Sequence, residues 1–273
     1  KNGNLSIYNP TFASSEYEFV GWYWDKNYTQ RTTNIPKGAF GDTTLYGKML
    51  KKYTIEYELN GGTKANSRTS YTSETATFAL GVAEGREGYS FAGWFDNENL
   101  SGVAVTEIPQ GSTGDKKFYA KWIPNTYTVT YDAGKFGEGS IDNGTKTHDV
   151  DFELSTEKFT RSGYTQEGWE NANGDIVSSP YTENADITLY PHWTLDSYTI
   201  TYVIDGEPAA LTPDEFSVED NVTLAAPEMA GYTFDGWYLD DGMTGEKVTG
   251  FGAGEYTDNQ TFYGKWIRTY TIT

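Results

Sequence analysis

The sequence predicts a mainly β protein, α+β at most, organised as a tandem array of repeats of roughly 72 residues. Three observations predict this class. Three sequence blocks recur in a fixed order with one period, and each block alternates side chains with the period of two that is typical of a strand. Gly and Asn turns separate the blocks, and extended Leu/Ala/Glu/Lys stretches that would predict helices are absent.

The first block is Tyr-Thr followed by Ile or Val, and it begins at Tyr53, Tyr127, Tyr198 and Tyr270. In "YTIEYELNGG" the side chains of Ile55 and Tyr57 share one face, while Glu56 points to the other. The "NGG" run at 60–62 is a strong turn signal. We therefore expect a strand that ends in a tight turn.

The second block contains a Gly-Trp pair, as "YEFVGWY" from Tyr17, "YSFAGWF" from Tyr89, "YTQEGWE" from Tyr164 and "YTFDGWY" from Tyr232. Strict alternation would place Phe234 and Trp237 on opposite faces of the strand. A Trp that recurs at the same strand position in every unit is expected in the core. A bend or bulge at Gly236 is therefore predicted to turn Trp237 inward.

The third block closes each unit, as "LYGKM" from Leu45, "FYAKW" from Phe118, "LYPHW" from Leu189 and "FYGKW" from Phe262. The large–small–large pattern on one face would let another element cross over the small central residue. Pro191 has no N–H to donate, so this strand is predicted to lie at a sheet edge or to turn that group outward. One more strand and a short helical turn are expected between the blocks, in "SYTSETATFAL" and "NVTLAAPEMAGYTF".

The periodic Trp residues are predicted to form the structural core of each unit, because a unit of about 70 residues buries a modest share of its chain. Aromatic side chains remedy this by burying roughly 150–250 Å² each. The predicted core positions are Trp22, Trp94, Trp169 and Trp237 in the second block and Trp122, Trp193 and Trp266 in the third.

The blocks predict a truncated first repeat, three complete repeats and the start of a fifth. The first repeat lacks its opening strand, and the last four residues resemble that strand. The predicted boundaries are 1–50, 51–124, 125–195, 196–267 and 268–273. These ends are expected either of a piece of a longer array or of an assembly joint, in which Tyr270–Thr273 completes a neighbouring molecule by strand addition and builds a head-to-tail filament.

The combination of "GYSFAGWF" with "FYAKW" and of "GYTFDGWY" with "FYGKW" resembles the Listeria–Bacteroides repeat, the family that includes the B-repeat of internalin surface proteins. The resemblance implies a compact β-grasp-like (ubiquitin-like) fold in each unit. It also implies a place in long extracellular microbial proteins, a spacer or adhesive role, and no catalytic residues. The third unit departs from the pattern with Gln166 and Glu170, and the first with Met49 in place of the closing Trp. We expect the core of the third unit to be filled differently.

Composition excludes several function classes. The formal net charge is −19, so nucleic acid is not an expected partner, since phosphate binding requires a basic surface. The sequence contains no run of 18 apolar residues, so membrane insertion of this segment is not predicted. Cysteine is absent, which excludes disulfides, thiolate metal sites and thiol nucleophiles.

The sequence predicts neither an enzyme nor a cofactor. The two histidines, His148 and His192, lie in different parts of one unit, and His192 occupies a solvent-facing strand position. No phosphate-binding loop or serine nucleophile motif is present. Calcium is the one metal considered, at the oxygen-rich turns 96–99 and 240–241, although Asn, Asp and Gly are also ordinary turn residues.

These observations favour a non-catalytic extracellular segment of a large surface protein, acting as a stalk whose repeats contact their neighbours. The alternative is an adhesin domain that binds a carbohydrate or a host protein. Trp24 is a second Trp that no other unit carries, and with Tyr23 and Tyr28 it is the predicted contact for such a ligand or partner. Packing of Trp24 against the next unit is the competing structural explanation.

Overall fold

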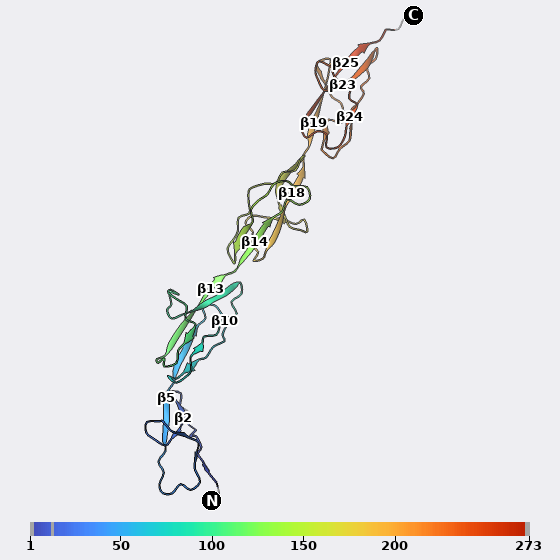
Figure 1. Cartoon of the computed structure of the whole chain (residues 1–273). Helices are drawn as coiled ribbons and strands as arrows, with labels where there is room; N and C mark the ends of the chain where they lie inside the picture. Colours follow the sequence, from blue (N-terminus) through green and yellow to red (C-terminus); the bar gives the residue numbers. More distant parts are fainter. Residues whose placement is uncertain (1–2, 12–13, 271–273) are drawn as a thin grey trace. The chain divides into compact units, whose positions relative to one another are not determined.

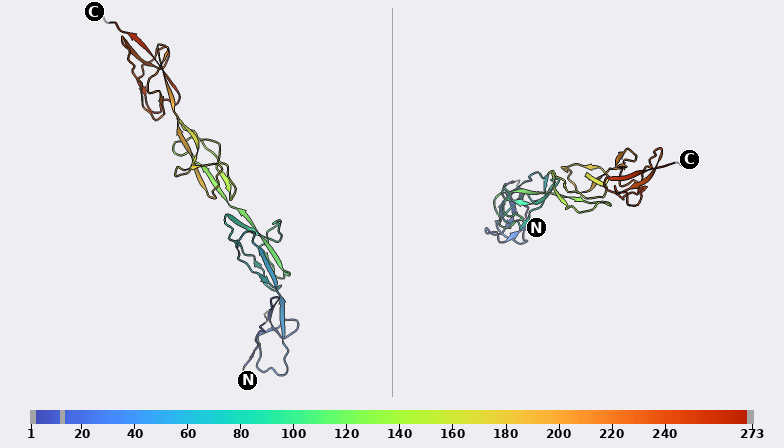
Figure 2. Two further views of the ribbon diagram at one scale, coloured as in Figure 1. Left: turned by 180° about the vertical axis from the view of Figure 1, so that it is seen from behind. Right: turned by 90° about the horizontal axis from the view of Figure 1, so that it is seen from above.

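The computed structural model describes residues 3–11 and 14–270, and every regular element in that part of the chain is a β-strand (Figures 1 and 2). The mainly β prediction is confirmed. The expected helical turn is absent from the described residues, which likewise contain no helix able to cross a membrane. The β-grasp detail stays a prediction. Residues 271–273 of the predicted fifth repeat lie outside the described residues.

The chain divides into two compact units, Lys1–Asn125 and Thr126–Thr273. The first unit begins with a small three-stranded sheet that carries the first Gly-Trp motif, and a two-stranded sheet lies beside it in the sequence. The three-stranded sheet contains β2 (Tyr17–Tyr23), β3 (Arg31–Thr32) and β5 (Tyr46–Lys51), and the two-stranded sheet contains β1 (Leu5–Ser6) and β4 (Asn34–Ile35).

The rest of the first unit is a four-stranded sheet in the order β11-β13-β6-β8, with two short two-stranded sheets. The four strands are β6 (Tyr53–Glu58), β8 (Ser70–Tyr71), β11 (Tyr89–Phe95) and β13 (Lys116–Pro124). The short pairs are β7 (Lys64–Ala65) with β10 (Ala83–Glu84), and β9 (Phe78–Ala79) with β12 (Glu107–Ile108).

The second unit contains two five-stranded sheets and one short pair. The first sheet, in the order β15-β14-β18-β16-β17, contains β14 (Thr126–Tyr131), β15 (Gly144–Thr147), β16 (Tyr164–Glu170), β17 (Ile176–Val177) and β18 (Ile187–Leu195). The second sheet contains β19 (Tyr198–Ile204), β20 (Glu207–Ala209), β21 (Glu215–Phe216), β23 (Tyr232–Tyr238) and β25 (Gln260–Arg268), and β22 (Val222–Thr223) pairs with β24 (Gly250–Phe251).

The three complete repeats share one central arrangement. The closing strand of each lies between the opening strand, to which it is parallel, and the Gly-Trp strand, to which it is antiparallel. The edge position predicted for the closing strand at Pro191 is therefore wrong, because β18 is flanked by β14 and β16. Instead, pairing of β14 with β18 ends at Leu189, whereas β19 pairs with β25 as far as Gly264. Pro191 takes the position of Gly264 and has no N–H to donate to β14. In the second repeat, where Ala120 takes this position, the parallel pairing ends at Tyr119.

The bulge predicted at Gly236 is confirmed. The register between β23 and β25 shifts between Phe234 and Trp237, and each of the other three Gly-Trp strands has a shift just before its Trp. The extra residue brings the rings of Phe234 and Trp237 to one face, with their centroids 4.8 Å apart. The Trp then lies opposite the small central residue of the closing strand, which is Gly264 in this repeat. A Cβ on Gly264 would lie 2.7 Å from the Phe234 ring, so the crossing element is this aromatic pair.

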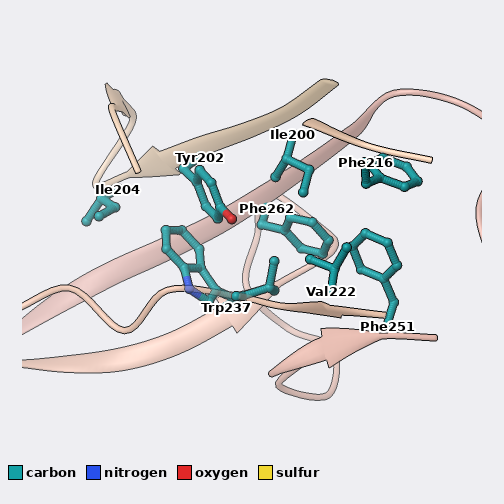
Figure 3. Packing of buried hydrophobic residues seen from close by; sticks show 9 residues of the cluster. Ile200, Tyr202, Ile204, Phe216, Val222, Trp237, Phe251 and Phe262 are labelled. Carbon is teal, nitrogen blue, oxygen red and sulfur yellow. The ribbon is translucent and has the colours of Figure 1, made fainter. Parts of the chain in front are cut away.

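The core of the last repeat shows how the motif packs (Figure 3). Trp237 is 3% exposed and lies against Tyr202, at a ring-centroid distance of 4.9 Å. The ring centroid of Phe234 lies 4.8 Å from it. The indole N–H donates to the Ala225 carbonyl at 2.6 Å. The same loop-carbonyl hydrogen bond recurs in every repeat, from Trp22 to Tyr8, from Trp94 to Gly81 and from Trp169 to Ser155. Trp94 and Trp169 are buried like Trp237, and Trp22 is half-buried.

The core of the third repeat is filled differently, as expected from Gln166. The Gln166 side chain is 3% exposed, accepts the Phe159 backbone N–H at 2.8 Å and donates to the Gly168 carbonyl. Phe159 is itself buried and packs edge-on against Trp169, at 5.9 Å. A ring from the preceding loop therefore replaces the strand Phe, and the buried amide is satisfied by backbone groups.

Replacing Trp237 by Ala is expected to lower the free energy of unfolding of the fourth repeat by about 3–5 kcal/mol, because a fully buried aromatic leaves a cavity and an unpaired loop carbonyl. Native-state hydrogen exchange read by mass spectrometry assigns the loss to residues 196–267. Trp24→Ala, at a half-buried position outside the recurring motif, is the control. A loss below about 1 kcal/mol in Trp237→Ala would contradict a core role.

The glycines before the Trp residues should differ in their tolerance of a side chain. Gly236 has φ +130° and a Cβ there would lie 2.9 Å from Lys247 Cδ, whereas Gly168 has no positive φ and nothing within 4 Å of its Cβ position. Gly236→Ala is expected to cost about 1–3 kcal/mol through backbone strain, and Gly168→Ala to cost much less. Urea denaturation of the two variants compares them directly. Equal losses would show that the bulge does not require a glycine.

Candidate functional site

The closing Trp residues are half-buried and differ in how they are held. Trp122 packs edge-on against Phe91 at 5.5 Å and donates its indole N–H to the Leu59 carbonyl at 2.8 Å. Trp266 packs against Phe234 at the same distance. Trp193 has no such partner, because Gln166 stands where the others have Phe. The third repeat therefore presents its closing Trp in a different setting.

An open pocket of about 360 Å³ lies beside Trp193. Its walls are the loop that follows β14, with Ala133 and Phe136, and the turn that follows β16, beginning at Glu170; Tyr190 of β18 also lines it. Ala133 occupies the register position of Leu59 and Ile204, which pack into the cores of the neighbouring repeats. The Ala133 side chain is smaller than those of Leu59 and Ile204, which leaves space beside Trp193.

The pocket combines aromatic surfaces with a carboxylate. Phe136 is 58% exposed, with the Lys135 ammonium 4.9 Å and the Arg161 guanidinium 4.8 Å from its ring centroid. Glu170 takes the place of Tyr23, Phe95 and Tyr238, and its Oε2 lies 2.8 Å from His192 Nδ1. The arrangement offers ring faces for stacking and oxygen acceptors for hydroxyl groups.

The residues that the sequence singled out in the first repeat form a cluster with a lysine. Tyr23 is 7% exposed and meets Tyr28 edge-on at 5.4 Å, while Tyr28 is 40% exposed and Trp24 is half-buried. The Lys48 ammonium lies 5.9 Å from the Tyr23 ring centroid and 5.7 Å from that of Tyr28, and it pairs with Glu74. Tyr23 is thus buried by this cluster, which contacts the next repeat through Lys48.

The oxygen-rich turns considered for calcium use their side-chain oxygens to hold backbone N–H groups. An Asp or Asn two or three positions after the Trp does this in each repeat: Asp25, Asn97, Asn171 and Asp240. The hydrogen bond from the Thr244 N–H holds the pKa of Asp240 below its usual value, together with that from Gly245. Within residues 3–11 and 14–270, no group of three or more His, Asp or Glu residues is placed to hold a metal ion.

The two histidines make separate contacts. His148 Nδ1 lies 3.0 Å from the Tyr127 hydroxyl, and His192 pairs with Glu170 on the outer face of the sheet. The His192 side chain is 42% exposed, in keeping with the solvent-facing position expected of it. Each imidazole thus has its own partner, and the structure gives the two histidines no shared contact.

Sequence reasoning did not find the pocket. Glu170 and Gln166 were visible as departures from the repeat pattern, and the alignment of Ala133 with Leu59 and Ile204 was a further signal. What could not be read from the sequence is that the loop at 133–136 and the turn after Glu170 meet around Tyr190 and Trp193.

The comparisons with known proteins agree with the repeat structure. Residues 1–48, 53–121, 127–192 and 198–265 each match the family model of the Listeria-Bacteroides repeat domain. Two relatives from Evansella cellulosilytica, a predicted Gly-rich membrane protein and a predicted membrane protein, are 26% and 28% identical over 83% and 95% of this chain. Internalin H of Listeria monocytogenes is 34% identical over 40% of it.

This chain is shorter than these relatives: the matches span 26% and 40% of the two Evansella proteins and 20% of internalin H. The family model nevertheless covers most of the chain in four successive matches, each of which contains one Gly-Trp strand and the first part of its closing strand. The chain therefore belongs to the Listeria-Bacteroides repeat family and carries four tandem copies of that repeat.

Proposed function

We propose that the chain is a non-catalytic, extracellular repeat segment of a large microbial surface protein, and that it acts as a spacer. Family membership and the membrane-protein relatives support a surface location. The observation that carries the spacer role is that successive repeats within each compact unit are tied together by linkers of one or two residues and by side-chain contacts.

The linkers are short at each junction between repeats. Lys52 alone separates β5 from β6, and Asn125 alone separates β13 from β14. Two residues, Asp196 and Ser197, separate β18 from β19. Linkers this short allow the chain little slack between one repeat and the next, which favours a spacer over flexibly tethered domains.

One acidic position reaches the preceding repeat in both units. Glu74 and Glu219 each lie three residues after the end of a short strand, β8 or β21. Glu74 pairs with Lys48 of the first repeat, and Glu219 accepts the Tyr164 hydroxyl of the third. Val218, the residue before Glu219, packs closely on Gly163 of the third repeat: a Cβ on Gly163 would lie 2.2 Å from Val218 Cγ1. These contacts supply nearest-neighbour stabilisation of the kind that stiffens repeat arrays.

The absence of cysteine makes the spacer proposal testable with spin labels in the full chain. Labels at Glu157→Cys in the third repeat and Asp241→Cys in the fourth, both exposed, report the distance between the two repeats. A narrow distance distribution in pulsed electron resonance is expected, and a broader one when Tyr164→Phe and Glu219→Gln remove the contact. Tyr232→Phe, at the same motif position in the fourth repeat, is the control. A parent distribution as broad as that of the double variant would overturn the spacer role.

The pocket of the third repeat favours a second function, binding of a neutral carbohydrate. Sugar rings present C–H faces that stack on aromatic side chains and hydroxyl groups that donate to carboxylates. Trp193, Tyr190 and Phe136 supply the first kind of surface and Glu170 the second. The net charge of −19 disfavours an anionic sugar, because long-range repulsion would oppose its approach.

We expect glucose, galactose, N-acetylglucosamine or their β-linked disaccharides to bind weakly, with Kd about 1 mM, in ligand-observed NMR. Ala133→Leu with Glu170→Phe installs the residues of the second repeat, so it should fill the pocket and weaken binding by about tenfold or more while the fold is kept. Trp122→Phe in the second repeat is the matched control and should leave binding unchanged. Binding that survives the double substitution, or no binding by any of these sugars, would reject the site.

A further inference from the structure

A lysine is buried in the third repeat without an acidic partner. Lys146 of β15 is 1% exposed, and its ammonium nitrogen contacts Asn184 Oδ1 at 3.1 Å and the Thr147 carbonyl at 3.3 Å. Within the described residues no carboxylate lies within ion-pair distance of this nitrogen. Burying an ammonium group without a carboxylate is costly, so the arrangement requires a physical reason.

Asn184 is held at both ends of its side-chain amide by one residue. The backbone N–H of Asp149 donates to Asn184 Oδ1 at 2.9 Å, and Asn184 Nδ2 donates to Asp149 Oδ1 at 2.8 Å. Asp149 adopts a left-handed conformation, with φ 57°, which is uncommon for a residue other than glycine. The second carboxylate oxygen of Asp149 lies 3.4 Å from His148 Nε2. The side-chain carbonyl of Asn184 is thus polarised by two donors, Lys146 Nζ and the Asp149 N–H, and its amide nitrogen donates to the Asp149 carboxylate.

The Lys–Asn pair is specific to this repeat. The position of Lys146 is taken by Tyr71 in the second repeat and Phe216 in the fourth, and both are buried aromatics. Asn184 lies three residues before the first residue of the closing strand that pairs with the opening strand. The same position holds Thr113 in the second repeat and Thr257 in the fourth. The amine and the carboxamide therefore occur together in one repeat and are both missing from the other two.

We propose that Lys146 and Asn184 form an intramolecular isopeptide bond. The neutral Lys146 amine attacks Asn184 Cγ, while the Asp149 N–H stabilises the negative charge that develops on Oδ1. The proton that the attacking nitrogen loses is transferred to the departing amide nitrogen, which Asp149 Oδ1 holds in position by accepting its hydrogen bond. The new Nζ–Cγ bond forms, the Cγ–Nδ2 bond breaks, and one ammonia molecule leaves. No oxidant or other reactant is required.

The cross-link gives the burial of Lys146 a physical reason and goes beyond the spacer proposal. An amide carries no charge, so the cost of burying an ammonium group disappears once the bond forms. The bond joins β15 at one edge of the sheet to the segment that leads into the central strand β18. Closing this loop covalently restricts the unfolded chain, as a disulfide does in other proteins, and this chain has no cysteine to do so.

Mass spectrometry of the intact chain, purified and incubated in neutral buffer, tests the proposal. The expected mass is lower than the sequence mass by one ammonia molecule, and proteolysis is expected to yield one branched peptide joining Lys146 to Asn184. Asn184→Ala and Lys146→Arg should each restore the full mass. Lys146→Tyr with Asn184→Thr, the residue pair of the second repeat, should also have the full mass and remain folded, which guards against loss of the bond through unfolding.

Succinimide formation at an Asn-Gly sequence, such as Asn143-Gly144, also releases ammonia, and the branched peptide distinguishes the two reactions. A mass loss that persists in Asn184→Ala, or that yields no branched peptide, overturns the proposal. So does the full mass after prolonged incubation of the parent chain. Asp149→Asn tests the positioning role of that carboxylate, because it should slow the loss of ammonia while the Asp149 N–H contact remains.

Discussion

Each repeat depends on the buried indole of its Gly-Trp motif. The ring can enter the core only because a bulge rotates it to the inner face and because the residue opposite, on the closing strand, is small. Once there, the indole N–H donates to a carbonyl in an irregular loop, and in the complete repeats the Tyr of the opening strand packs on its ring. The described residues contain no helix to cover the sheet. The indole therefore joins the sheet to loops that regular structure does not hold.

The third repeat keeps this interaction while changing almost everything around it. Trp169 still donates to a loop carbonyl and still packs on Tyr131, but the ring that replaces the strand Phe is Phe159 of the loop, and the strand position itself holds an amide, Gln166. Pro191 has no N–H to donate to β14, and Ala133 fills less space than its counterparts. The departures are not scattered. They open one surface pocket beside Trp193, and at the other end of β14 a lysine replaces a buried aromatic.

The sequence alone predicted the features that depend on local spacing. The strand alternation follows from side-chain direction along a strand, and the bulge at Gly236 follows from that alternation together with the recurrence of the Trp in every repeat. The position of the closing strand did not follow. The local chemistry of Pro191 predicts a sheet edge or an outward-turned N–H position, yet the parallel pairing of β14 with β18 joins segments more than fifty residues apart in the chain. The contact between Lys146 and Asn184 is also non-local, as is the pocket that Ala133 and Trp193 line together. The sequence shows only that these residues depart from the repeat pattern.

In this chain the repeated core is needed for folding, and the variable periphery is where the repeats differ. The Trp, its bulge and the small residue opposite are needed by every copy to fold, so they leave little freedom for a copy to specialise. Specialisation must then arise at positions that face the core only in part, where a residue can change without removing the indole from its place. Glu170 and Ala133 are of this kind, since Glu170 ends β16 and Ala133 lies two residues beyond β14. Lys146 is fully buried, but it lies on the edge strand β15, away from the indole. The same reasoning places the contacts between repeats, Glu74 and Glu219, on turns just beyond the short strands. In a tandem array built this way, stability resides in what the repeats share, and any activity that one repeat adds must come from where it differs.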